Sequence, residues 1–80
     1  MHPTILRLKA VLRARGRSRT SHYNDILMGL FTHPVSIGAR AVGWPEHEVA
    51  ALNGARISGL DDAEIRQLVV QLETARKRAS

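Results

Sequence analysis

The sequence predicts one mostly α-helical domain with a small β-hairpin. Apolar residues recur at helical spacing in four segments, and two short segments between residues 35 and 44 alternate with a period of two. The 80 residues are too few for a second domain. A chain of this size buries only about 60% of its unfolded surface, so its core is small. It contains no cysteine that could reinforce this core through a disulfide or a thiolate metal site.

The first two predicted helices are joined by a very short turn. Residues 1–4 are expected to be flexible, and the first helix covers 6–15 and ends at Gly16, which suits the left-handed conformation of a helix end. Ser18 is a good N-cap for a second helix over 19–28. The residues expected on its buried side are Tyr23, Ile26, Leu27 and Leu30. A two-residue joint forces a sharp corner, which is the geometry of a helix-turn-helix.

A β-hairpin is expected to follow, because Pro34 cannot continue a helix. Segments 35–37 and 41–44 are its strands, and Gly38-Ala39-Arg40 forms a tight turn between them. Arg40 therefore lies at the tip of the hairpin.

Two more helices complete the predicted fold. Pro45 suits the first position of a third helix, which Gly54 weakens by about 1 kcal/mol. Asp61 and Glu64 form an acidic capping box before a last helix over 62–78. The apolar face of this last helix consists of Ile65, Leu68, Val69, Leu72 and Ala75. That face either folds back on the core or pairs with another subunit.

Positive charge is concentrated in the first half of the chain. Residues 1–40 hold seven basic side chains and one acid, which gives +6, whereas residues 41–80 hold five basic side chains and six acids, which gives −1. Such a basic block either meets a polyanion, most often nucleic acid, or remains a solvated face.

The predicted elements together form a winged helix-turn-helix over residues 5–57, followed by a C-terminal helix within 58–80 that packs or self-associates. The major groove of DNA is about 12 Å wide and admits one helix, which presents its N-terminal residues to the base edges. The residues expected to be exposed there and to contact DNA are Arg17, Arg19, Thr20, Ser21, His22 and Asn24. The ring of Tyr23 is expected to pack while its hydroxyl reaches a phosphate. Arg40 at the hairpin tip suits the minor groove or the adjacent phosphates.

An ordered set of residues also resembles a known family. The set is Leu6-Arg7-Leu8-Lys9-x-Val11-Leu12, Gly16-x-Ser18-Arg19-Thr20, Tyr23 with Ile26 and Gly29, Phe31, Pro34-Val35, and Gly38-x-Arg40-Ala41-Val42-x-Trp44. Residues 5–57 are thereby similar to the AlpA-type regulators and excisionases of prophages and integrative elements, which have a MerR-like winged helix-turn-helix. By position, the resemblance implies that Ser18, Arg19, Thr20 and Tyr23 meet DNA through the recognition helix. It also implies that Arg40 lies on the wing.

The function that this resemblance implies is sequence-specific binding to double-stranded DNA. An excisionase, or recombination directionality factor, binds and bends an attachment site so that an integrase can excise the element. The alternative is an AlpA-like transcription regulator that binds a promoter. Integrase is thus a candidate partner, and self-association on DNA is expected through Ile65, Leu68, Val69 and Leu72.

Two other classes of binding protein remain as alternatives. In a protein-interaction module, the C-terminal helix would bind a partner while the basic half only tethers nucleic acid. A small RNA-binding protein is a more remote alternative, because readers of single-stranded RNA usually stack bases on several aromatic rings. Trp44 and Phe31 are each the single residue of their type, and we expect both to anchor the core.

The sequence argues against an enzyme, a metalloprotein and a membrane protein. No serine nucleophile with a plausible base and no glycine-rich phosphate loop is present, and no cofactor is expected. The four histidines, which lack the spacing of a metal site, are His2, His22, His33 and His47. No segment approaches the roughly 18 apolar residues of a membrane span, and no signal peptide is recognisable. The expected location is the bacterial cytoplasm, in association with the nucleoid.

Overall fold

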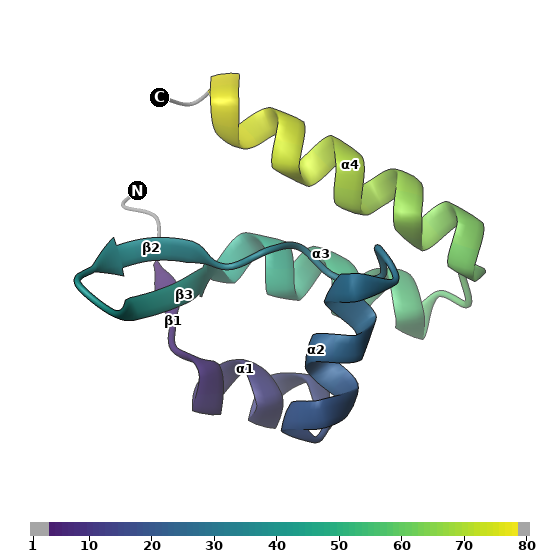
Figure 1. The fold of residues 1–80 in the computed structure, drawn as a ribbon. Coiled ribbons are helices and arrows are strands. Elements are labelled where there is room, and N and C mark those ends of the chain that lie inside the picture. The colour runs from purple at the N-terminus through teal and green to yellow at the C-terminus, as the bar shows by residue number, and fades with distance from the viewer. Residues whose placement is uncertain (1–3, 79–80) are drawn as a thin grey trace.

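A computed structural model describes residues 4–78 and shows four helices around a small antiparallel sheet (Figure 1). The elements in chain order are β1 (Ile5–Leu6), α1 (Leu8–Arg15), α2 (Arg19–Leu27), β2 (Val35–Gly38), β3 (Ala41–Pro45), α3 (Glu46–Ile57) and α4 (Asp62–Arg78). The predicted fold class is confirmed: the architecture is that of a winged helix-turn-helix with an added C-terminal helix. The flexible segment expected at 1–4 falls, apart from Thr4, outside the described residues.

The sheet has a strand that the sequence did not predict. Its order is β1-β3-β2, and Leu6 of β1 pairs with Trp44 of β3. The prediction that the first helix begins at Leu6 is therefore wrong, because this residue belongs to a strand and α1 begins at Leu8. Gly43 permits the close approach of β1, since a Cβ atom there would lie 2.5 Å from Cγ2 of Ile5 and 2.9 Å from the Leu6 carbonyl oxygen.

The wing is the β2–β3 hairpin, which projects at the left of Figure 1. Gly38 pairs with Ala41, so the connecting loop consists of Ala39 and Arg40 and is one residue shorter than predicted. Arg40 adopts a left-handed conformation, with φ of 63°. This conformation costs a residue with a side chain roughly 1–2 kcal/mol, and the wing tip is therefore strained.

Local signals define most helix ends, as predicted. Gly16 ends α1 in a left-handed conformation with φ of 66°. The Ser18 hydroxyl caps α2 by accepting a hydrogen bond from the Ser21 amide, at 3.2 Å. Asp61 and Glu64 bond each other's amides reciprocally, at 3.1 and 2.9 Å, and this capping box precedes α4. Gly54 does not end α3, which continues to Ile57. The prediction that Pro45 is the first residue of this helix is wrong, because Pro45 is the last residue of β3 and the N-cap of α3, which begins at Glu46.

The core lies between the four helices and the inner face of the sheet. Its buried apolar members are Val11, Ile26, Leu30, Phe31, Trp44, Val49, Leu52, Ala55, Ile65 and Val69. Trp44 and Phe31 are buried as predicted, and the Trp44 indole Nε1 donates to the Thr32 carbonyl oxygen at 2.9 Å. The prediction for Leu27 is wrong: its side chain is 84% exposed, because it points away from the core at the last turn of α2.

The apolar face of α4 folds back on the core of its own chain. Ile65 and Val69 are buried there, and Leu68 and Leu72 pack against the same cluster. The prediction that Ile65 and Val69 take part in self-association is therefore wrong, because packing within the chain already covers both side chains.

Two arginines of α4 also bond the backbone of the connection between α2 and β2. Arg66 Nε donates to the Met28 carbonyl oxygen at 2.9 Å. Arg76 donates to the His33 carbonyl oxygen at 2.8 Å and to the buried Glu48 carboxylate at 2.7 Å. The C-terminal helix is thus attached at both ends of residues 28–33.

Candidate DNA-binding surface

The N-terminal turns of α2 form one part of the candidate surface. Arg19, Thr20 and Asn24 are exposed there, as a contact with base edges or phosphates requires. Ser21 and Tyr23 are partly buried. The hydroxyl of Ser18 already caps the helix and donates to Ser21 Oγ at 3.0 Å, so its first role is structural.

His22 is not part of this surface. We expected its side chain to be exposed, but it is fully buried, and this prediction is wrong. The physical reason is its position one helical turn before Ile26, on the face of α2 that packs against the core. Its ring makes edge contacts with the rings of Tyr23, Phe31 and Trp44, at centroid distances between 4.8 and 5.3 Å.

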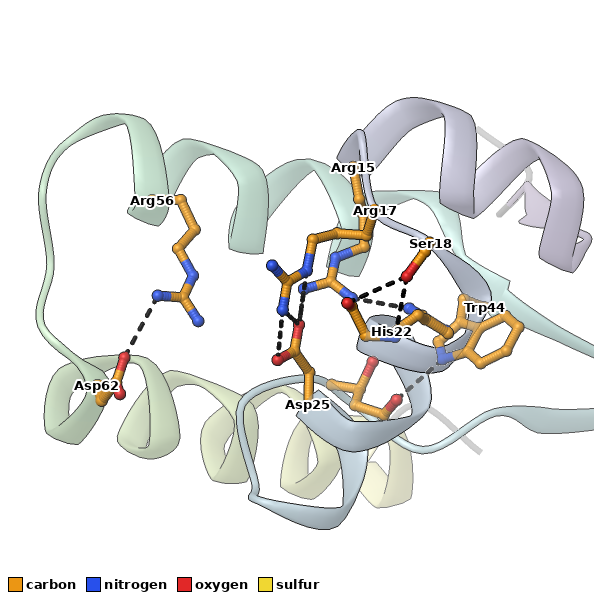
Figure 2. A network of polar contacts seen from close by, with 10 residues as sticks. Arg15, Arg17, Ser18, His22, Asp25, Trp44, Arg56 and Asp62 are labelled. Atoms are coloured by element: carbon orange, nitrogen blue, oxygen red, sulfur yellow. Dashed lines mark hydrogen bonds and ion pairs between the residues drawn. The ribbon is translucent and has the colours of Figure 1, made fainter.

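An ion-pair network holds the corner between α1 and α2 (Figure 2). Asp25 is the lone acid in the first 45 residues, and its carboxylate accepts from Arg15 Nη2 at 2.7 Å and from Arg17 at 2.8–3.2 Å. The side chain of Arg15 is only 7% exposed, and its guanidinium carbon lies 4.1 Å from the Phe31 ring centroid. The side chain of Arg17, at the turn, is 43% exposed and forms an ion pair with Asp25. Sequence reasoning did not identify this network.

Arg15 also fixes the protonation state of His22. Its Nη1 lies 2.7 Å from His22 Nδ1. A guanidinium can only donate, so Nδ1 accepts and the neutral ring carries its proton on Nε2. Burial and the neighbouring charge of Arg15 lower the pKa of His22 to about 4, well below the ordinary value of 6.5. Protonation of Nδ1 would break this hydrogen bond and place a second positive charge beside Arg15.

The folded protein should lose stability between neutral and mildly acidic pH because of His22. Its pKa is depressed in the folded state, so its contribution is fully present above about pH 6.5 and is lost as the pH falls towards 4. From this shift we expect the free energy of unfolding to fall by about 2 kcal/mol between pH 7 and pH 5. Urea denaturation at several pH values measures this. The His22→Gln variant, whose amide oxygen can still accept from Arg15, should lack this component, and an identical pH dependence of both proteins would contradict the assignment.

The wing tip forms the second part of the candidate surface. Arg40 is exposed in the two-residue loop, and no ion pair joins it to an acid within residues 4–78. A strained backbone under an exposed arginine is a feature that functional sites often retain. The arrangement suits contact with a phosphate or with a narrow groove.

Exposed cations that join no acid are concentrated in the N-terminal half of the described chain, whereas exposed Arg66 of α4 bonds a carbonyl oxygen. The exposed cations of residues 4–78 that join no acid in an ion pair and lie before α3 are Arg7, Lys9, Arg13, Arg19 and Arg40. In the second half, Arg56 pairs with Asp62, and Arg76 pairs with Glu48. The positive field is therefore concentrated on the helix-turn-helix and the wing, where a polyanion would bind.

Neither a metal site nor a membrane-spanning helix is found among the described residues. Among residues 4–78, no group of three or more histidine, aspartate or glutamate side chains is placed to hold a metal ion. No helix in the same segment combines the length and the apolar character that a membrane crossing requires.

The fold has a capped helix after a sharp corner, a β wing, and positive charge concentrated on these N-terminal elements. This combination is typical of winged helix-turn-helix DNA-binding proteins. The chain belongs to the AlpA family: the family model described as prophage CP4-57 regulatory protein (AlpA) matches residues 4–51. Membership indicates a prophage-associated DNA-binding regulator. Comparisons with curated proteins and with solved structures found no match.

Proposed function

We propose that this protein binds a specific site on duplex DNA, with the N-terminus of α2 in the major groove and the wing against the neighbouring backbone. One observation carries the proposal: the N-terminal part of the chain exposes two sets of suitable side chains. Arg19, Thr20 and Asn24 are exposed on α2, and Arg40 is exposed on the wing. Arginine can bind guanine in a bidentate manner and asparagine can bind adenine, so these side chains supply direct base readout.

We assign a role within this proposal to each predicted contact residue from the exposure and bonding of its side chain. Arg19, Thr20 and Asn24 are the base-reading candidates, while Ser21 and the Tyr23 hydroxyl are candidates for phosphate contact at the edge of the helix. Ser18 supports the binding helix by capping its N-terminus. Arg17 supports it by bonding Asp25, which holds the turn before this helix in place. His22 acts only inside the core.

Substitution of Arg19 should weaken binding and relax sequence preference together. If Arg19 binds guanine, Arg19→Ala should cost about 1–3 kcal/mol of binding free energy and remove the preference at one base pair. Electrophoretic mobility shift or fluorescence anisotropy, with a set of single-base variants of the site, measures both quantities.

Arg40→Gly provides the comparison, since glycine relieves the left-handed backbone strain at the wing tip while it removes the charge. This variant should fold at least as stably as the wild type but bind all sequences more weakly, with a shallower salt dependence. Unchanged binding of both variants to every duplex would exclude the proposed mode of reading.

We further propose that the biological role is that of an excisionase, which binds side by side at an attachment site and bends it for an integrase. Bending costs about 1–6 kcal/mol, and contacts by several copies along the site offset this cost. The second candidate, favoured by the description of the family as regulatory, is a transcription regulator at a promoter.

Footprinting at a stated salt concentration over the DNA that flanks the gene separates the two roles. Protection of repeated motifs within an attachment site, with stimulation of excision by the cognate integrase, is the outcome expected of an excisionase. Protection of a promoter alone would overturn the excisionase role and favour the regulator.

A further inference from the structure

We infer that the outer face of α1 is a second DNA-contact surface, which binds backbone phosphates through Lys9 and Arg13. The inference rests on the proposed DNA-binding function and adds to it a site separate from the α2 N-terminus and the wing. Its ligand is the phosphodiester backbone of duplex DNA, and it contributes affinity without reading the sequence.

The geometry of α1 places both cations on the side opposite to the core. Val11, which lies between them in the sequence, is fully buried, and two residues correspond to about 200° of rotation around a helix. Lys9 and Arg13 therefore both point away from the core, one turn apart, and both are exposed. With Leu12, Gly16 and Arg17 they line a shallow groove.

The spacing of these cations suits a row of phosphates. Four residues advance a helix by about 6 Å, and each DNA strand carries one phosphate about every 3.4 Å along the duplex axis. Lys9 and Arg13 can thus reach different phosphates of one backbone segment. The helix that precedes a recognition helix also crosses the backbone in this class of fold.

The charge pattern is difficult to explain by stability alone. Like charges four residues apart destabilise a helix by about 0.2–0.5 kcal/mol, and α1 has no acidic residue to offset them. The nearest acid in the sequence, Asp25, is already bonded to Arg15 and Arg17. Two exposed cations on a helix that has no acidic residue favour the binding of a polyanion.

The test compares the salt dependence of DNA binding for the wild type and the Lys9→Gln/Arg13→Gln variant. Each phosphate neutralised adds about 0.9 to the slope of log K against log salt, so the double variant should lose about 1.8 from the slope. This loss corresponds to about 30-fold weaker binding at 0.15 M salt. The ratio of affinities for the specific site and a random duplex should stay unchanged, in contrast to Arg19→Ala.

Two further variants control for net charge and for folding. Arg56→Gln/Lys77→Gln removes the same number of charges from α3 and α4 and should change the slope by less than about 0.5 if contact is local. The exchange Lys9→Arg/Arg13→Lys keeps both charges and should retain the wild-type slope. Thermal melts followed by circular dichroism establish that all variants fold.

The outcomes separate this inference from the proposed function. The inference is overturned if Lys9→Gln/Arg13→Gln leaves the slope unchanged, or if the α3 and α4 control loses as much slope. The proposed function still holds in either case, provided that binding depends on Arg19. Failure of the wild type to bind any duplex in a salt-dependent manner overturns both.

Discussion

Asp25→Ala is expected to destabilise the protein by about 3–5 kcal/mol, because it leaves the nearly buried guanidinium of Arg15 without its counter-ion. A domain of this length has a total stability of about 4–12 kcal/mol, so a large part of the folded population would be lost. The corner between α1 and α2 should loosen first, since Asp25 joins the last residue of α1 to the turn residue Arg17. Urea denaturation followed by circular dichroism measures the loss.

A double variant tests whether the unpaired charge causes this effect. Arg15→Met/Asp25→Leu replaces the buried pair by apolar groups of similar size and should recover most of the stability that Asp25→Ala loses. Glu64→Ala, which removes an exposed acid from the α4 cap, should cost only about 1 kcal/mol. A loss below about 1 kcal/mol for Asp25→Ala would show that Arg15 finds another partner or reaches solvent.

Trp44→Ala is expected to cost a similar amount, about 3–5 kcal/mol, through a cavity at the centre of the core. The Trp44 side chain is fully buried, makes an edge contact with His22 and is the largest residue of the core. The substitution also removes the donor to the Thr32 carbonyl oxygen, which is held at the base of the wing. Far-UV circular dichroism during thermal and urea unfolding gives the free energy, since the variant has no tryptophan to report by fluorescence.

Ile57→Ala is the matched control for a large apolar residue, because the Ile57 side chain is 86% exposed and its truncation should change stability by no more than about 0.5 kcal/mol. Trp44→Phe keeps most of the volume and should lose less than Trp44→Ala. Equal stability of Trp44→Ala and Ile57→Ala would be incompatible with the packing described above.

The sequence predicted those features that depend on neighbouring residues along the chain. The Ser18 cap, the Asp61–Glu64 capping box and the left-handed Gly16 each require only one turn of helix, and the structure contains all three. The hairpin was also predictable, since its strands alternate and its loop is short. The extent of α4 followed from one long periodic segment.

The features that the sequence did not predict depend on distant partners. Strand β1 has two residues and exists through pairing with β3, nearly 40 positions later in the chain. Burial of His22 depends on the rings of Phe31 and Trp44, although its spacing from Ile26 was a usable signal. The position of Asp25 as a lone acid among many cations was likewise a usable signal that was not read, but which arginines it binds is determined by the helix corner.

The attachment of α4 has a consequence for how related chains recognise DNA. The family match ends within α3, so α4 lies outside the shared segment, yet Arg66 and Arg76 bond the carbonyl groups of Met28 and His33. Those carbonyls lie at the two ends of the connector between α2 and the wing, which are the two parts that we propose contact DNA. A relative with the same N-terminal segment but a tail without these arginines would hold the connector less firmly, so under the proposed binding mode the spacing between α2 and the wing would be less fixed.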